Sequence, residues 1–291
     1  IDELVQSLRV LTPAGVIQTR RVPASGAGPA PERLFLGSEG TFGIITEAWL
    51  RVQPRPRWRA SASVRFQRFA DGVMATRALS QSGLYPSNCR LLDEKEAMLH
   101  RVTADGTAVL LLAFESADHP VEPWMERALS IATDLGGDCD EEPRYSTDIV
   151  YSMRPSALSS QPPASVPPSA ELPDIQQEER TGPQVFVGTR DSAASYHDHE
   201  DAASWKRSFF DAPYVQSALV SLGLVCDTFE TACTWERFPE LHKAVMSAVE
   251  SAMKQVCGGG IVTCRFTHVY PDGPAPYYTF LAPGRPGEEA E

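Results

Sequence analysis

The stretch LGSEGTFGIITE, residues Leu36–Glu47, decides how the first part of this chain folds. Three glycines within seven residues stand between a short apolar run, Leu34–Leu36, and a β-branched run, Ile44–Thr46. The pattern predicts a strand that enters a tight turn and a second strand that leaves it. Glycine permits a positive φ and lets a ligand approach the main chain closely, and successive N–H groups in such a turn can hold an anion. The turn is therefore either a pyrophosphate cradle or a purely structural glycine hairpin.

The turn differs from two well-known phosphate-binding loops. No Gly-Lys-Ser/Thr follows it, as in the phosphate loop of nucleotide hydrolases, and it leads into a strand, whereas G-x-G-x-x-G opens a helix. A second glycine run, Cys257–Gly260, follows a predicted helix instead of opening one, so we interpret it as a helix C-cap.

Two regions with different secondary structure are predicted. Before Pro56 the chain is β-rich, with strands at Leu4–Val10, at Gly15–Val22 and around the glycine turn. From Ala60 on, strands alternate with helices, and two rounds of this alternation indicate an α+β domain with an antiparallel sheet. The strands are predicted at Ser61–Phe66, Cys89–Leu92, Thr107–Glu115, Leu224–Thr231, Ile261–Tyr270 and Tyr277–Ala282, and the helices at Ala70–Ser82, Val121–Leu135, Tyr214–Leu222 and Pro239–Val256.

The composition argues against several classes of protein. The formal net charge of −12 over 291 residues opposes a general nucleic-acid or anionic-membrane surface, and we interpret the basic cluster Arg51–Arg59 as a solvated linker. The six cysteines form no C-x-x-C pair, and several lie in apolar strand-like runs, so we expect reduced thiols in an intracellular compartment. No apolar run is long enough to cross a membrane.

The two rounds are separated by a proline-rich stretch, Ser152–Thr189, with many serines and alanines. Such a stretch cannot bury enough apolar area to offset its ordering entropy, so it is predicted to be a disordered insert or an error in the gene model. The following HDHED, His197–Asp201, has a metal-like composition. Histidines two apart face the same way only on a strand, and no third ligand is fixed nearby, so a solvated acidic loop is favoured and no metal site is predicted.

Five stretches, taken in order, resemble one family of flavoproteins. Gly37–Glu47 is similar to the last flavin-contacting loop of the FAD-linked oxidases of the vanillyl-alcohol-oxidase type. The other four resemble stretches of the alkylglycerone-phosphate synthases and their bacterial relatives, which form one branch of that family. They are Ile1–Gly15, Cys89–Glu94, Asp227–Arg237 and Thr263–Tyr270.

The resemblance implies a fold and a cofactor. Residues 1–56 would be the C-terminal part of an FAD-binding domain of the PCMH type, and residues 57–291 a ferredoxin-like cap domain with an antiparallel sheet and a disordered insert at 152–189. The rest of the FAD-binding domain and a histidine-rich loop would lie outside the chain, so this fragment alone is expected to be inactive. The implied FAD contacts are Gly37, Ser38, Glu39, Gly40, Thr41, Gly43, Ile44 and Ile45.

The resemblance also gives roles to three residues. Tyr277, with Tyr278 beside it, aligns with the tyrosine that accepts and donates the proton in the synthases. Arg90, in the apolar CRLLD run, needs a carboxylate or a ligand as partner, and the match to the flavin-facing edge of the cap favours substrate binding. Gln216 stands where the synthases carry an arginine that holds the fatty-acyl carboxylate. Glutamine can hydrogen bond there but supplies no charge.

Two further polar residues, Arg265 and His268, lie in the predicted strand Ile261–Tyr270. Side chains three positions apart on a strand point to opposite faces of the sheet. Arg265 and His268 are therefore not expected to share one site.

Three candidate functions follow, two of them enzymatic. The resemblance implies an FAD-dependent enzyme that exchanges the acyl group of acylglycerone phosphate for a fatty alcohol in ether-lipid synthesis, with no net redox change. Gln216 keeps a second enzyme open, an FAD-linked oxidase or dehydrogenase of a 2-hydroxy acid or alcohol. A truncated, non-catalytic cap module is the third. The resemblance further implies a small-molecule or lipid substrate, a homodimer, and a cytoplasmic or peroxisomal location with the targeting region outside the chain.

Overall fold

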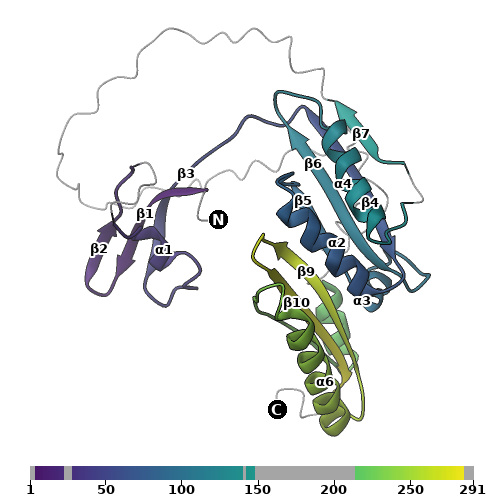
Figure 1. Cartoon of the computed structure of the whole chain (residues 1–291). Helices are drawn as coiled ribbons and strands as arrows, with labels where there is room; N and C mark the ends of the chain where they lie inside the picture. Colours follow the sequence, from purple (N-terminus) through teal and green to yellow (C-terminus); the bar gives the residue numbers. More distant parts are fainter. Residues whose placement is uncertain (1–3, 23–27, 140–141, 148–213, 285–291) are drawn as a thin grey trace, which may run out of the picture. The chain divides into compact units, whose positions relative to one another are not determined.

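A computed structural model describes residues 4–22, 28–139, 142–147 and 214–284 (Figure 1). The chain divides into two compact units, Ile1–Arg55 and Pro56–Glu291. The proline-rich stretch Ser152–Thr189 and the acidic run His197–Asp201 lie outside the described residues.

The first unit is a small antiparallel sheet with one short helix. Strands β1 (Val5–Thr12), β2 (Gly15–Gln18) and β3 (Ile44–Leu50) pair in the order β2-β1-β3, and helix α1 (Glu32–Phe35) packs on β1. A compact apolar cluster joins the sheet to the helix. It contains Val5, Leu8, Val10 and Phe35.

The prediction of a strand at Leu34–Leu36 is wrong, because residues Glu32–Phe35 form α1. Pro31 precedes the helix with helical φ and ψ, and Glu32 lies in its first turn, where an acidic side chain is favoured. The helical turn lets Phe35 point into the apolar cluster. The glycine turn is therefore entered from a helix and left by the strand β3.

The second unit is built around one seven-stranded sheet. Its strands are β4 (Trp58–Phe66), β5 (Asn88–Leu92), β6 (Ala108–Ser116), β7 (Arg144–Thr147), β8 (Leu224–Glu230), β9 (Ile261–Val269) and β10 (Pro274–Pro283). Its helices are α2 (Phe69–Gln81), α3 (Glu94–Leu99), α4 (Glu122–Asp134) and α6 (Phe238–Cys257), and residues 214–221 are also helical. The predicted strands and helices of this unit are confirmed to within a few residues, while α3 and β7 were not predicted.

The strand order β7-β4-β6-β5-β9-β10-β8 is antiparallel throughout. Helix α2 connects β4 to β5, and β6 lies between these two strands. The same arrangement recurs at the other end, where α6 connects β8 to β9 and β10 lies between them. This split β-α-β arrangement is the ferredoxin-like pattern, so the α+β prediction with an antiparallel sheet is confirmed.

The two faces of the sheet differ in chemistry. One face is apolar and packs against α2, α4 and α6, which Figure 1 shows beside their strands. Its largest buried side chains include Phe66, Leu110, Leu112, Phe114, Phe266 and Tyr278. The opposite face, called the open face below, carries Arg90, Thr263, Arg265, Tyr277 and Thr279, as the strand registers require.

Helix α3 lies on the open face. Its Ala97 joins a small apolar cluster with Leu92 of β5 and with Val109 and Leu111 of β6. The helix starts at Asp93, whose Oδ1 accepts a hydrogen bond of 2.6 Å from the Glu96 N–H. At the end of α6, Gly258 has a φ of +79°, so the predicted C-cap is confirmed.

Candidate functional site

The glycine turn exposes its main chain. Gly37 and Gly40 have φ values of +77° and +82°, and a Cβ added to either would meet no atom within 4 Å. The Ser38 and Thr41 N–H groups donate inside the turn, to the carbonyls of Phe35 and Ser38. The N–H groups of Glu39 and Gly40 form no hydrogen bond with any residue that the structure describes.

This geometry fits the close approach of a flat or anionic group to the turn. The Glu39 and Gly40 N–H groups are available as donors, and Gly37 and Gly40 leave space where side chains would stand. Beside the turn, Ile44 and Ile45 are 67% and 43% exposed, which offers an apolar surface next to the donors. Gly43 differs from the other two glycines, because its main chain lies against β1. The turn thus combines one structural glycine with two that could serve a cofactor.

Tyr277 lies on β10, on the open face of the second unit. Its hydroxyl donates a hydrogen bond of 2.8 Å to Thr228 Oγ1 on β8. Arg265, its register partner on β9, covers the ring, with the guanidinium carbon 3.9 Å from the ring centroid. A phenol beneath a cation is the arrangement expected of a group that carries a proton and transient negative charge.

A buried carboxylate holds the Arg265 guanidinium in place. Arg265 Nη1 forms an ion pair with Glu96 of α3, whose side chain is fully buried. Glu96 also accepts a hydrogen bond from the Thr263 hydroxyl and lies 3.1 Å from His100 Nε2. Burial alone would raise the pKa of Glu96, but the His100 hydrogen bond and the Arg265 charge outweigh it, and the pKa is lowered. Glu96 is therefore a stable anion.

Arg90, on β5, belongs to the same polar region. Burial and the nearby positive charge of Arg265 both lower its pKa. Two guanidinium groups are thus close enough to repel each other on the open face. Such a pair is suited to a phosphate or carboxylate, because each guanidinium can donate two parallel hydrogen bonds.

The neighbouring Tyr278 faces the other way. It is fully buried among the helices, and its hydroxyl lies 3.3 Å from His242 Nδ1. Burial raises the pKa of the Tyr278 phenol and lowers the pKa of His242. Of the two adjacent tyrosines, Tyr277 alone lies on the open face.

Gln216 and His268 stand apart from this cluster. The Gln216 amide is exposed and donates a hydrogen bond of 3.1 Å to the Cys226 carbonyl of β8. Among the described residues, no hydrogen bond joins it to Tyr277 or Arg90. His268 is exposed, whereas Arg265 is largely covered.

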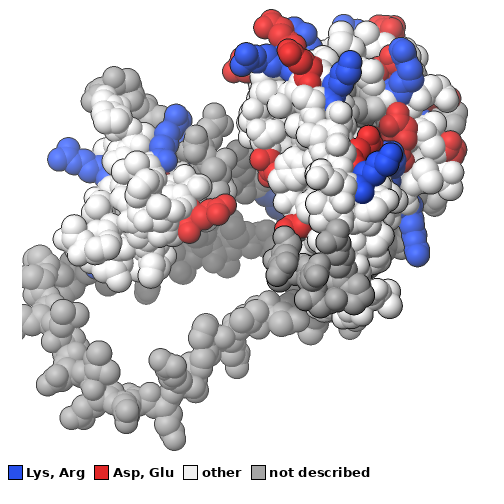
Figure 2. Space-filling model, turned by 90° about the horizontal axis from the view of Figure 1, so that it is seen from below, with Lys and Arg blue, Asp and Glu red and all other residues white. Residues whose placement is uncertain are grey.

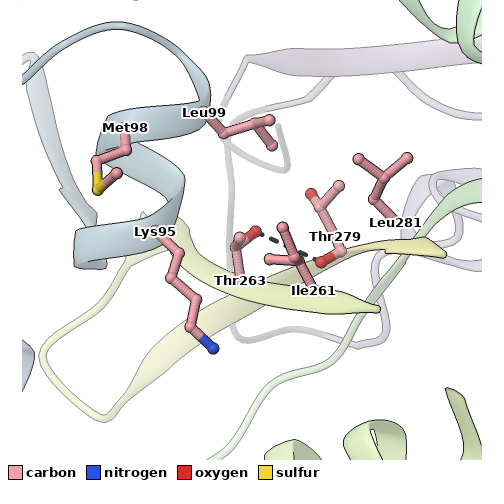
Figure 3. A pocket seen from close by; sticks show the side chains of 7 residues that line it. All are labelled: Lys95, Met98, Leu99, Ile261, Thr263, Thr279 and Leu281. Carbon is pink, nitrogen blue, oxygen red and sulfur yellow. Dashed lines mark hydrogen bonds between the residues drawn. The ribbon is translucent and has the colours of Figure 1, made fainter. Parts of the chain in front are cut away.

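A pocket of about 390 Å³ adjoins the cluster between α3 and the strands β9 and β10 (Figure 3). Its lining is mostly apolar, and Figure 3 shows that it comes from the helix on one side and the two strands on the other. The lining residues are Lys95, Met98, Leu99, Ile261, Thr263, Thr279 and Leu281. The Thr279 hydroxyl is buried without a hydrogen-bond partner in the described part of the chain. Because Thr279 and Thr263 each lie two residues from Tyr277 and Arg265 on the same face, pocket and cluster are continuous along the strands.

Sequence reasoning missed Glu96, Thr228 and the pocket. A usable signal was present for the first, because Asp93 and Glu96 have the spacing of a helix capping box. Nothing local links Glu96 to Arg265, 169 residues away. Within the described ranges, no group of three or more His, Cys, Asp or Glu residues could hold a metal ion. Basic and acidic side chains are interspersed on the face of the second unit that Figure 2 shows.

This fold and site define a flavoprotein cap domain. The chain belongs to the family described as 'FAD linked oxidases, C-terminal domain', whose model matches residues 55–142 and 177–290. The cofactor of this family is FAD. The chain is 24% identical over 286 residues to the alkyldihydroxyacetonephosphate (alkylglycerone-phosphate) synthase of Caenorhabditis elegans, covering 96% of the chain and 42% of that protein.

Two other proteins are similar. The mitochondrial D-lactate dehydrogenase [cytochrome] of Arabidopsis thaliana is 41% identical over 92 residues, which cover 31% of the chain and 16% of that protein. A solved alkyldihydroxyacetonephosphate synthase structure has a TM-score of 0.64 at 18% identity, covering 99% of the chain and 46% of that structure, a likeness that shows the fold alone. The chain spans less than half the length of the synthases it matches. No described helix is both long enough and apolar enough to span a membrane.

Proposed function

We propose that the protein containing this chain is an FAD-dependent enzyme that exchanges the acyl group of acylglycerone phosphate for a fatty alcohol. The observation that carries the proposal is Tyr277, a phenol on the open face beneath the Arg265 guanidinium and beside an apolar pocket. The similarity to the C. elegans synthase along nearly the whole chain supports the same reaction.

Each residue has a distinct part in this reaction. When bound, FAD would supply the electrophilic chemistry of the exchange, in which the acyl group leaves as a fatty-acid carboxylate and the fatty alcohol takes its place. Tyr277 takes a proton from the substrate and returns it, while Arg265 favours the negative charge that develops beside it. Arg90, a second cation on the open face, binds the phosphate. The apolar pocket accepts the hydrocarbon chain, whose burial contributes about 0.8 kcal/mol per CH₂ group.

A second candidate is oxidation of a 2-hydroxy acid. It is favoured by the local similarity to a D-lactate dehydrogenase and by the two guanidinium groups of Arg90 and Arg265, which suit a carboxylate. The substrate would lose a hydride from carbon to FAD and a proton from its hydroxyl to Tyr277. Gln216 agrees with this reading, because a hydroxy acid has no fatty-acyl carboxylate for an arginine to hold at that position.

The visible absorption spectrum of the complete natural protein separates the candidates. A flavin spectrum that persists with hydroxy acids, together with alkyl product from acylglycerone phosphate and a fatty alcohol, supports the synthase. Bleaching by a 2-hydroxy acid supports the oxidase. A colourless protein that takes up no FAD would contradict both and leave the non-catalytic cap module.

An intracellular location is part of the proposal. All six cysteines are free thiols, and the pKa of Cys89 is raised to about 12 by burial. A buried, protonated thiol reacts slowly, and unpaired cysteines are typical of reducing compartments.

A further inference from the structure

We propose that Glu96 is a positioning residue, which holds the Arg265 guanidinium over the Tyr277 ring. The inference rests on the proposed role of Tyr277. It adds a residue of α3 that pairs with Arg265 and acts on Tyr277 through it.

Glu96 is itself fixed by the helix and the sheet. Its N–H is bound by the Asp93 carboxylate, whose other oxygen accepts a hydrogen bond of 2.6 Å from the Cys264 N–H of β9. This ties the first turn of α3 to the strand that carries Arg265. The Thr263 hydroxyl, from the same strand, donates to the second Glu96 oxygen. The carboxylate therefore has little freedom to follow Arg265 if the arginine moves.

Arg265 needs such an anchor because another cation lies near it. Arg90 lies two residues from Leu92, the register partner of Arg265, on the same face of the sheet, and the Arg265 charge contributes to the lowered pKa of Arg90. Without Glu96, the repulsion between two guanidinium groups would favour a rotamer of Arg265 that reaches solvent and leaves the Tyr277 ring. The ion pair with Glu96 keeps the side chain only 12% exposed.

Two other titratable groups in this region, Glu230 and His100, do not replace Arg265. Glu230 is the register partner of Tyr277 on β8, but it is an anion, and its Oε1 accepts a hydrogen bond of 3.0 Å from Thr267. On α3, His100 contacts Glu96. Arg265 has its guanidinium carbon 3.9 Å from the centroid of the phenol ring, so its position affects the charge that Tyr277 experiences.

Nuclear magnetic resonance of the full chain with labelled arginine side chains tests the position directly. The Arg265 signals, assigned by their loss in Arg265→Met, are expected to be shifted upfield by the Tyr277 ring current, and Tyr277→Leu should abolish that shift. In Glu96→Gln the upfield shift should be lost as well. Glu250→Gln is the control, because it removes a negative charge near α3, where Glu250 pairs with Lys95, without touching Arg265.

Retention of the upfield shift in Glu96→Gln would overturn the proposal. If Glu96→Gln does not fold, Thr263→Val replaces it, because it removes the hydroxyl that donates to Glu96. Loss of the upfield shift in Thr263→Val would support the proposal, and its retention would contradict it. The measurement requires no enzymatic activity, so its result does not depend on whether the proposed reaction is correct. With the complete enzyme, Glu96→Gln should lower kcat roughly tenfold or more with KM nearly unchanged, and should add little to Arg265→Met.

Discussion

The main chain of Gly43 lies against that of Leu11. A Cβ atom on Gly43 would stand 2.6 Å from the Leu11 carbonyl oxygen and 2.9 Å from Val10 Cγ1, and φ at Gly43 is +151°. The contact fixes the start of β3 on β1 and thereby the position of the glycine turn that precedes it. Gly37, at the other end of the turn, has no such neighbour.

Substitution of the two glycines by alanine should therefore affect stability and FAD binding differently. Gly43→Ala should destabilise the first unit by about 1–3 kcal/mol, because the methyl group clashes with β1 and the backbone becomes strained. Gly37→Ala should cost about 1–2 kcal/mol for its left-handed backbone, and should weaken FAD binding more than Gly43→Ala does at temperatures where both are folded. Thermal unfolding and FAD titration of the complete protein measure the two effects.

An equal loss of FAD affinity in both variants would contradict this division. It would mean that FAD binding depends on the stability of the turn and not on access to its main chain. Ser38→Ala tests the turn itself, since it removes the hydrogen bond of 2.8 Å to the Phe35 carbonyl and leaves the glycines unchanged.

Replacing each of the adjacent tyrosines by phenylalanine should separate chemistry from packing. Tyr277→Phe removes the hydroxyl on the open face and should lower kcat by about 10²–10⁴, the range for loss of a general acid–base group. Tyr278→Phe removes a buried hydroxyl near His242 and should change stability by about 1 kcal/mol with little effect on kcat. Turnover with retained FAD absorbance, and the urea midpoint, are the measurements.

The reverse result would move the proton-transferring role to Tyr278. It would require a different conformation of β10, because Tyr278 is fully buried on the helix-covered face. Crystals of the inactive variant would show whether the strand register had changed.

The alternating pattern of the second unit made its fold predictable. β6 is a continuous apolar run typical of a strand buried on both faces, and Val245 and Val249 recur at helical spacing in α6. The first unit was harder, because Leu34–Leu36 is too short for a period to distinguish strand from helix. Pro31 and Glu32 were the better signals there.

The sequence predicted only those residues of the candidate site that can be identified without knowing which residue they contact. A resemblance could point to Tyr277 and Arg90, and strand alternation separates Tyr277 from Tyr278. The partner of Arg265 could not be predicted, because Glu96 reaches it from a six-residue helix on a distant segment. Contacts of this kind depend on the order β6-β5-β9-β10 in the sheet, which no local pattern specifies.

Filling the pocket should discriminate between substrates by chain length. Leu281→Trp places a large side chain among apolar neighbours such as Met98 and Ile261. KM for a long-chain substrate should rise roughly tenfold or more, while KM for a short-chain analogue should stay within a factor of about three, since only a long chain reaches the filled volume. Thr279→Ser, which keeps the hydroxyl, is the control. Equal effects on both chain lengths would exclude the pocket as the chain-binding site.

Asp93 should make the stability of the second unit depend on pH. Burial, only partly offset by hydrogen bonds from the Glu96 and Cys264 N–H groups, raises its pKa from 3.8 to about 7. Between these values the folded state binds a proton that the unfolded state releases. The free energy of unfolding should therefore fall as pH rises from about 4 to 7, by an amount on the order of 4 kcal/mol, and stay level above that range.

Comparison with Asp93→Asn isolates this effect. The variant loses one acceptor, a cost that does not change with pH, so the advantage of the native protein over the variant should shrink between pH 5 and 7. Glu96 contributes with the opposite sign and only below its ordinary pKa of 4.5, outside this window. Urea unfolding from pH 5 to 8 measures the difference, with the exposed Asp118→Asn as control. A constant difference across the range would show that Asp93 stays ionised in the folded protein, with the Glu96 and Cys264 N–H groups outweighing its burial.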